Sequence, residues 1–157
     1  MDVTAFRAEL GDIPVEDHPR IVQQKSRDHY WYSPILKAQL DQVTADIVVS
    51  PRTQEDVVAI LRAAYRHKVP VTPRGAGTGN YGQAMPLAGG AILNLAGLDR
   101  VISITHDSVR AEAGVILEKL DEQTIAAVGG EMRFHPSTYR MATLGGFIAG
   151  GSGGVGS

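Results

Sequence analysis

The glycines that follow a short apolar segment are the residues of this sequence that point most directly to chemistry. Residues 69–72 lead into a loop in which Gly77, Gly79 and Gly82 are spaced as G-x-G-x-x-G. Because glycine has no Cβ, its backbone N–H groups can approach a ligand closely, and successive N–H groups in a turn form a concave site for phosphate. A second stretch, residues 145–157, contains seven glycines. Two such loops predict a ligand long enough to touch both, as a dinucleotide is.

The residues around the first loop distinguish three phosphate-binding patterns. The Rossmann fingerprint has to open a helix, because the pyrophosphate rests on the helix N-terminus. Here Pro86 and Gly89-Gly90 follow closely and disfavour a helix, which leaves the Rossmann pattern as an alternative. A P-loop ends in Gly-Lys-Ser/Thr, and none of the four lysines follows a glycine. We therefore favour a strand followed by loops that hold phosphate with main-chain amides and without a helix.

Composition and charge exclude several classes of function. At 157 residues the chain is most simply one domain, and a net charge of −2 with 6% aromatic residues gives no expected nucleic-acid surface. The absence of cysteine excludes disulfides, thiolate zinc sites and cysteine nucleophiles. The histidines lack metal-ligand spacing, no apolar run is long enough for a transmembrane segment, and the N-terminus lacks a signal-peptide pattern. These features predict a cytoplasmic protein that binds a small molecule and holds no metal.

Residues 46–73 have the pattern of a strand, a helix and a second strand. Residues 47–49 form a β-branched run that Pro51 ends. Thr53 then has the character of a helix N-cap, with Asp56 completing an approximate capping box. Apolar residues recur at three- and four-residue spacing through the helix, and residues 69–72 form the next strand. This segment predicts a βαβ unit.

The hydrophobic period changes after residue 90. Residues 91–95, 101–104 and 108–113 are strand candidates, and residues 115–128 form a second predicted helix that Gly129-Gly130 ends. The fold class expected from this order is α+β, with the 46–73 βαβ unit packed beside the antiparallel strands of 91–113 in an antiparallel or mixed sheet. We assign residues 1–42 to a leader packed on the domain edge and residues 43–157 to the nucleotide-binding domain.

Several motifs occur in a fixed order along the second and larger part of the chain. They are Val49-Ser50-Pro51, Thr53 to Val57, Pro70 to Gly79, Gly89-Gly90, Leu95 to Ile104, Gly114, Pro136-Ser137 and Thr143 to Gly146. In order and spacing they resemble the PCMH-type FAD-binding domain of the vanillyl-alcohol oxidase and p-cresol methylhydroxylase flavoprotein family. The resemblance extends from Val48 to Ser157 and is nearest to the glycolate oxidase FAD subunit and D-lactate dehydrogenase branch.

The resemblance implies FAD as the cofactor, with its pyrophosphate on the amides of residues 74–78 and its flavin near Gly145 and Gly146. The implied cofactor-binding residues are Pro73, Arg74, Gly75, Ala76, Gly77, Thr78, Gly79, Asn80, Gly82, Gln83, Pro136, Ser137, Thr138, Thr143, Leu144, Gly145, Gly146, Gly150, Ser152 and Gly153. It also implies an oxidoreductase that transfers a hydride from a 2-hydroxy acid, of the D-lactate or glycolate type, to FAD. Neither a catalytic base nor the electron acceptor is identifiable from these residues.

Four departures from the family pattern modify these expectations. Thr78 stands where relatives that tether the flavin through this loop carry a histidine, and there is no cysteine for the second known link. We therefore expect noncovalent FAD. Gln83 replaces a second glycine of many relatives, and Phe147 replaces an asparagine, so the contacts near the flavin are expected to differ.

The fourth departure is that the chain ends at Ser157, within the second glycine stretch. The resemblance implies that an adenine-contacting segment and a substrate domain follow in relatives, so we expect a truncated nucleotide domain. Such a chain should bind FAD weakly and should not turn over substrate by itself. A nucleotide-binding module without activity of its own is the alternative. A cytoplasmic location is expected, with peripheral attachment to the inner face of the membrane as a variant.

Overall fold

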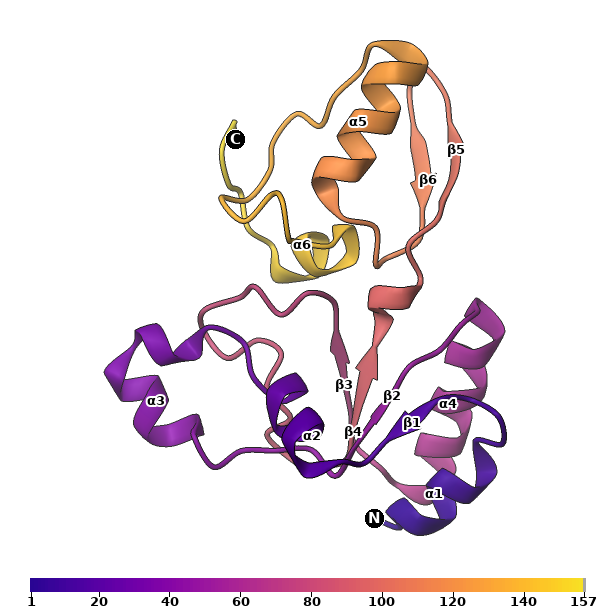
Figure 1. Cartoon of the computed structure of the whole chain (residues 1–157), viewed down its shortest axis with the longest axis vertical. Coiled ribbons are helices and arrows are strands. Elements are labelled where there is room, and N and C mark those ends of the chain that lie inside the picture. Colours follow the sequence, from indigo (N-terminus) through magenta and orange to yellow (C-terminus); the bar gives the residue numbers. More distant parts are fainter. Residues whose placement is uncertain (157) are drawn as a thin grey trace.

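The computed structural model describes residues 1–156, which form a mixed four-stranded sheet and a smaller lobe beyond one end of its strands (Figure 1). The sheet has the order β1–β2–β4–β3. β1 (Val15–Glu16) is antiparallel to β2 (Ile47–Val49), whereas β4 (Ala91–Asn94) is parallel both to β2 and to β3 (Val71–Arg74). The helices of this larger lobe are α1 (Val3–Glu9), α2 (Pro19–Lys25), α3 (Pro34–Leu40) and α4 (Gln54–His67), with the 3-10 turn η1 (Tyr30–Tyr32) before α3.

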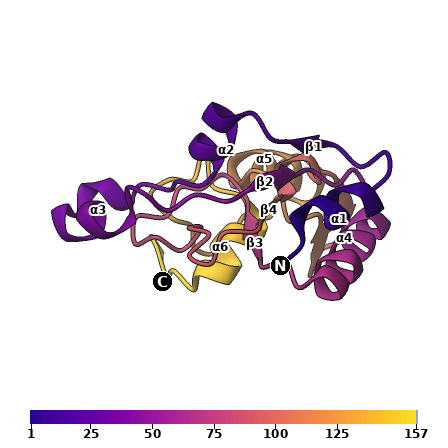
Figure 2. The same ribbon diagram turned by 90° about the horizontal axis from the view of Figure 1, so that it is seen from below.

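Helices cover both faces of the sheet (Figure 2). Side chains alternate between the two faces of a strand, so Ile47 and Val49 lie on one face and Val48 on the other. α1 and α4 pack on the first face, where Phe6 and Ile60 are fully buried with Ile47 and Val49. α2 packs on the second face, where Val22 contacts Val48 and Ile92. Each face thus has its own apolar core.

The predicted capping of the central helix is confirmed. The Thr53 hydroxyl accepts from the backbone N–H of Asp56 at 3.1 Å, and the Asp56 carboxylate accepts from the backbone N–H of Thr53 at 3.2 Å. This reciprocal pair satisfies two of the donors that a helix N-terminus leaves without intrahelical partners. α4 therefore begins where the sequence predicts, one residue after Thr53.

The α+β fold class is confirmed, but the expected position of residues 91–94 is wrong. We expected this strand among antiparallel strands beside the βαβ unit, whereas β4 is parallel and lies between β2 and β3. Ala91, Ile92 and Leu93 are all buried, so this strand is apolar on both faces. Such a strand is stable in the middle of a sheet covered on both sides.

The smaller lobe contains the antiparallel pair. After the 3-10 turn η2 (Leu95–Gly97), β5 (Val101–Ile104) pairs with β6 (Val109–Ala111), and helices α5 (Leu117–Val128) and α6 (Leu144–Gly150) follow. Leu117, Ala142 and Phe147 form the apolar core of this lobe. The second glycine stretch, which we expected to be a loop, begins as α6. Its helical start is explained by the Thr143 hydroxyl, which accepts from the N–H of Gly146 at 3.3 Å as an N-cap.

The N-terminal segment is integrated into the sheet and its core. β1 pairs with β2 through Val15 and Glu16, and Phe6 of α1 belongs to the main apolar cluster together with Leu10. Glu9 of α1 is bonded to Arg66 and His67 of α4 at 2.6 and 2.7 Å. The boundary between residues 42 and 43 that we drew from the sequence stays a prediction.

Candidate cofactor site

The first glycine loop leaves the carboxyl end of β3, at the edge of the sheet that faces the smaller lobe (Figure 1). Parallel strands place their carboxyl ends at one edge, and ligands of open α/β sheets bind outside that edge. Residues 75–90 contain turns and bends and no helix. The Rossmann alternative is therefore excluded, because its phosphate site requires a helix at this point.

The backbone of this loop has free donors. The N–H groups of the five residues Ala76 to Asn80 donate no hydrogen bond to another backbone group within residues 1–156. Ala76 to Gly79 are half-buried and Asn80 is exposed, so these N–H groups lie at the surface, where a ligand can reach them. A run of such groups in a glycine-rich turn is suited to an anion, and the partly buried pyrophosphate of FAD has the matching acceptors.

The two segments that we predicted to share a ligand lie against one another. A Cβ on Gly75 would overlap the hydroxyl of Thr143, so this glycine allows α6 to approach the loop. The hydroxyl of Thr138 donates to the hydroxyl of Thr78 at 3.4 Å. The cofactor loop and residues 138–143 therefore form one continuous surface across the junction of the two lobes.

The second segment presents different groups from the first. The N–H groups of Leu144 and Gly145 donate to the carbonyls of Val115 and Ala113, each at 2.8 Å, and that of Gly146 donates to Thr143. These amides are thus already paired within the protein. Contact of Gly145 and Gly146 with a flavin stays a prediction, and it would involve their Cα surfaces rather than their N–H groups.

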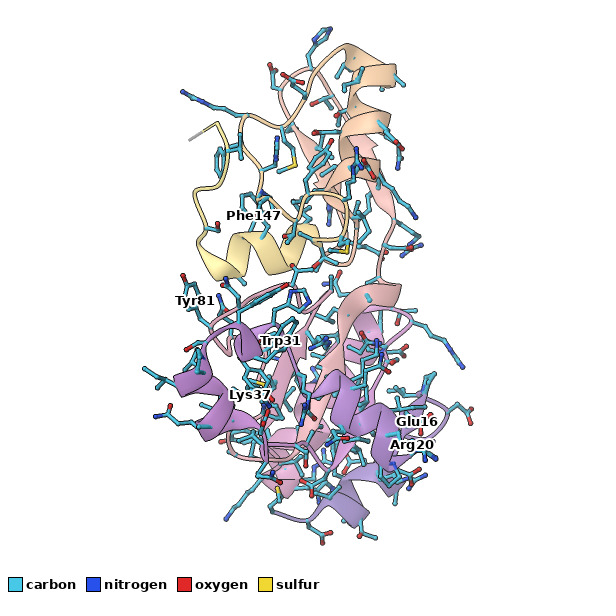
Figure 3. All side chains as sticks on the ribbon, turned by 60° about the vertical axis from the view of Figure 1, so that its left-hand side comes forward. Glu16, Arg20, Trp31, Lys37, Tyr81 and Phe147 are labelled. Carbon is cyan, nitrogen blue, oxygen red and sulfur yellow. The ribbon has the colours of Figure 1, made fainter. Side chains whose placement is uncertain are left out.

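The remaining predicted residues lie at the margins of this surface. Pro136 is half-buried and Ser137 is exposed. Gly150, the last residue of α6, is exposed, as are Ser152 and Gly153 beyond it. The last described residues turn back, since Val155 pairs with His135 through bonds of 3.1 and 2.7 Å. Figure 3 shows Phe147 on the side of α6 that faces the smaller lobe, with Tyr81 on the opposite side. Phe147 therefore serves as a core residue.

Gln83 closes the far end of the loop. Its side-chain oxygen accepts from the N–H of Tyr81 at 3.0 Å, and it lies beside Gly79. The amide side chain thus occupies space that a glycine at this position would leave empty. The departure at Gln83 that we noted in the sequence therefore has a structural role inside the loop.

The side chain of Arg74 packs against the loop at Gly77. Gly77 has a positive φ of 69°, and a Cβ at this residue would overlap the Arg74 guanidinium. The guanidinium donates to the carbonyl of Arg27 at 2.5 Å, and Arg74 is only 9% exposed. Burial lowers the pKa of Arg74, and the negative charge of Asp28 opposes that shift. The predicted contact of Arg74 with phosphate stays a prediction.

Sequence reasoning did not connect the N-terminal segment with this site. The N–H of His29 donates to the carbonyl of Gly79 at 2.7 Å, and the carbonyl of Arg27 accepts from Arg74. These contacts join residues about fifty positions apart, and polar residues in a segment without periodicity gave no signal for them. Trp31 and Tyr32 stack at 4.1 Å and are exposed, next to this junction.

Asp121 was also not singled out from the sequence, although it anchors the second segment. It is 5% exposed, and its two carboxylate oxygens accept from the N–H of Met132 and the hydroxyl of Tyr139, each at 2.8 Å. Burial, followed by the bond to Asp121, raises the pKa of Tyr139 to about 12. The Tyr139 hydroxyl is therefore a stable donor at neutral pH, and it fixes residues 132–139 against α5.

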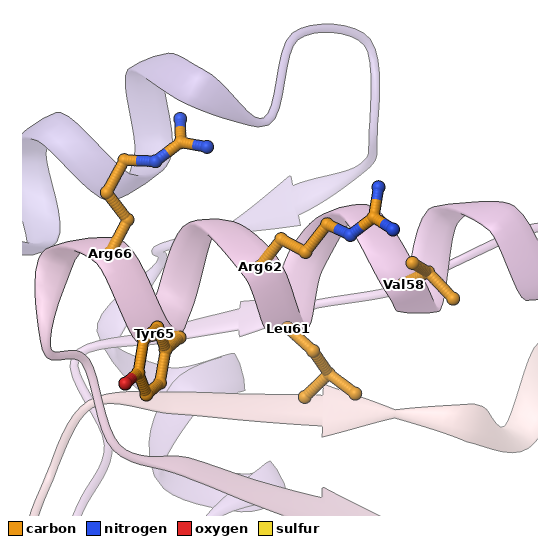
Figure 4. Close-up of a pocket in the computed structure, with 5 residues that line it drawn as sticks. All are labelled: Val58, Leu61, Arg62, Tyr65 and Arg66. Atoms are coloured by element: carbon orange, nitrogen blue, oxygen red, sulfur yellow. The ribbon is translucent and has the colours of Figure 1, made fainter.

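Other surfaces have no connection with the glycine stretches. Val58, Leu61 and Tyr65 form an exposed apolar hollow on α4, flanked by Arg62 and Arg66 (Figure 4). No group of three His, Asp or Glu side chains within residues 1–156 could hold a metal ion. No helix in the described part of the chain is long and apolar enough to cross a bilayer.

A row of free amides beyond the carboxyl ends of parallel strands, next to a second glycine segment, is the arrangement expected of a nucleotide-binding domain of the α+β class. Residues 45–157 match the family described as the FAD binding domain. The chain therefore belongs to the FAD binding domain family, and FAD is the cofactor of that fold.

Characterised relatives are longer than this chain. It is 32% identical over 119 residues to the glycolate oxidase subunit GlcD of Bacillus subtilis (strain 168), a match that covers 73% of this chain and 24% of that protein. It is 37% identical over 112 residues to a D-lactate dehydrogenase of Archaeoglobus fulgidus, covering 69% and 24%. The chain thus spans about a quarter of the length of these relatives.

Solved structures confirm the predicted PCMH-type fold. Alkyldihydroxyacetonephosphate synthase superposes with a TM-score of 0.81 at 20% identity, covering 95% of this chain and 32% of that one. p-Cresol methylhydroxylase superposes with a TM-score of 0.73 at 20% identity, covering 93% and 28%. At these identities the likeness establishes the fold alone, and it agrees with the resemblance seen in the sequence.

Proposed function

We propose that this chain is the FAD-binding part of a flavin-dependent oxidoreductase that oxidises a 2-hydroxy acid. The observation that carries the proposal is the row of free N–H groups from Ala76 to Asn80, which lies against the segment of Thr138 and Thr143. This surface fits an extended ligand that carries a charged group with several hydrogen-bond acceptors. FAD has both features.

The protein's part in this proposal is to bind and orient. The amides of residues 76–80 hold the pyrophosphate, and the hydroxyl of Thr78, which accepts from Thr138, keeps its own O–H as a donor beside it. When bound, FAD supplies the hydride acceptor, because the redox chemistry of flavoenzymes belongs to the cofactor. The α6 segment limits the space around the loop through the contact of Thr143 with Gly75.

The substrate class is inferred from the relatives. Their names include a glycolate oxidase subunit, D-lactate dehydrogenases and a D-2-hydroxyglutarate dehydrogenase, and glycolate, lactate and 2-hydroxyglutarate are all 2-hydroxy acids. A catalytic base and a carboxylate anchor for such a substrate are not assigned to residues of this chain. The choice among these acids, the electron acceptor and the cytoplasmic location stay predictions.

FAD should be held without a covalent bond. Thr78 has no nucleophilic nitrogen, and the sequence has no cysteine. Acid precipitation of the FAD-loaded protein should therefore leave the flavin in the supernatant, where its absorbance is measured after centrifugation. Yellow colour that remains with the washed precipitate would show that this inference is wrong.

The chain of 157 residues should bind FAD weakly and should not reduce a dye in the presence of substrate. Several hydrogen bonds to a charged group contribute roughly 1.5–3 kcal/mol each, but ordering backbone around a ligand costs roughly 1–2 kcal/mol per residue. Titration with FAD, followed by addition of D-lactate or glycolate with a dye acceptor, tests both statements. Weak binding without dye reduction is the expected result, whereas tight binding with dye reduction would contradict it and show that the chain is sufficient for activity.

A further inference from the structure

The carboxylate of Asp28 has an unmet hydrogen-bonding requirement beside the cofactor loop. Asp28 lies between α2 and η1 and is 3% exposed. One of its oxygens accepts from the N–H of Tyr30 at 2.9 Å. The other, Oδ2, is buried and accepts no hydrogen bond from any described residue. An incompletely paired buried carboxylate is costly, so its presence calls for a compensating interaction.

The two residues that flank Asp28 in the chain are hydrogen-bonded to the two ends of the loop. The carbonyl of Arg27 accepts from Arg74 at 2.5 Å, and the N–H of His29 donates to the carbonyl of Gly79 at 2.7 Å. A Cβ at Gly79 would lie 3.4 Å from Asp28 Oδ2. The unpaired oxygen therefore lies against the same five-residue segment that carries the free N–H groups.

Arg74 supplies the opposite charge. Its guanidinium is buried under Gly77, where it occupies the space that a side chain at residue 77 would take. The negative charge of Asp28 favours the charged form of this guanidinium. A buried cation and a buried anion thus act on each other at the base of the loop, where the guanidinium is bonded to the Arg27 carbonyl and the residue after Asp28 is bonded to Gly79.

We propose that Asp28 is a positioning residue of the FAD site, which acts through Arg74. Its carboxylate balances the buried guanidinium and so holds the Gly75–Gly79 backbone in the shape that directs the free N–H groups outward. This inference rests on the proposed function, because the shaped loop is the one that receives the pyrophosphate. It assigns to the cofactor site a residue from the segment that the sequence suggested to be a leader.

The test uses the whole chain with Asp28→Asn, which keeps the size of the side chain and removes its charge. Affinities for FAD and for inorganic pyrophosphate are measured by titration. Asp28→Asn should weaken both by about tenfold or more, the size expected when a buried charge interaction is lost. Asp12→Asn, at an exposed position of the same N-terminal segment, is the matched control and should leave both affinities unchanged.

A double-mutant cycle separates positioning from a general structural role. In an Arg74→Met background, Asp28→Asn should have little further effect, because the carboxylate then has no cation to balance. The free energies of unfolding should show the same non-additivity without any ligand. Equal effects of Asp28→Asn in both backgrounds, or no effect in either, would overturn the inference. Failure of the unsubstituted chain to bind FAD would instead count against the proposed function, and the unfolding cycle would still decide the role of Asp28.

Discussion

Replacing Gly77 with valine should abolish FAD binding. Gly77 has a φ of 69°, which β-branched residues rarely adopt, and a Cβ there would overlap the guanidinium of Arg74. The left-handed conformation alone costs a side chain roughly 1–2 kcal/mol, and displacement of Arg74 also removes its bond to Arg27. We expect a loss of affinity of about 100-fold or more, measured by titration with FAD.

Gly129→Val is the matched control for this experiment. Gly129 ends α5 with a φ of 71°, but a Cβ there would meet no atom within 4 Å. The two glycines share a backbone conformation and differ in their surroundings. Gly129→Val should therefore lower stability without a specific loss of FAD affinity. Equal losses of affinity in both variants would mean that strain, rather than the shape of the cofactor loop, explains the effect.

Asp121→Ala should destabilise the smaller lobe by about 2–4 kcal/mol. The substitution leaves the N–H of Met132 and the hydroxyl of Tyr139 without their acceptor. The site is buried, since Asp121 is only 5% exposed. Residues 132–139 would lose these two bonds to α5, and Thr138 would be held less firmly beside Thr78. FAD affinity should fall together with the free energy of unfolding, which denaturant titration measures.

Glu122→Ala provides the comparison for Asp121. Glu122 is the next residue of α5 and is exposed, so its replacement should change the free energy of unfolding by less than about 0.5 kcal/mol. Tyr139→Phe removes one of the two bonds to Asp121 and should fall between these variants. If Asp121→Ala were as stable as Glu122→Ala, the anchoring role of the buried carboxylate would be disproved.

Local signals in the sequence predicted the elements whose causes are local. The capping pair of Thr53 and Asp56 defines the start of α4, and the glycine after Val128 ends α5. The order of strands in the sheet could not be predicted from such local signals, because it depends on which strand can be buried on both faces. Ala91 to Leu93 carried that information in their apolar run, yet the change of period after residue 90 suggested an antiparallel neighbour instead.

The candidate site was predictable to the extent that it follows from glycine spacing. The loop after β3 and its proximity to residues 138–143 were expected from the pattern and the family resemblance. The helix α6 was not, since glycine disfavours helices and only the cap at Thr143 and the packing of Phe147 offset this. Asp28 and Asp121 were missed because an aspartate in a polar segment gives no sign of burial until its neighbours in space are known.

The position of the cofactor loop between two distant segments has a consequence for biosynthesis. Arg74 is bonded to a residue 47 positions upstream, whereas Thr78 is bonded to one 60 positions downstream. The upstream partner, Arg27, has already been synthesised when the loop leaves the ribosome, but residues 138–143 emerge later. The nascent loop is therefore half-built for the time that those residues take to be translated, roughly three to twelve seconds at about 5–20 residues per second. During that interval the loop lacks the hydroxyls of Thr138 and Thr143, which lie beside Thr78 and Gly75 in the folded protein.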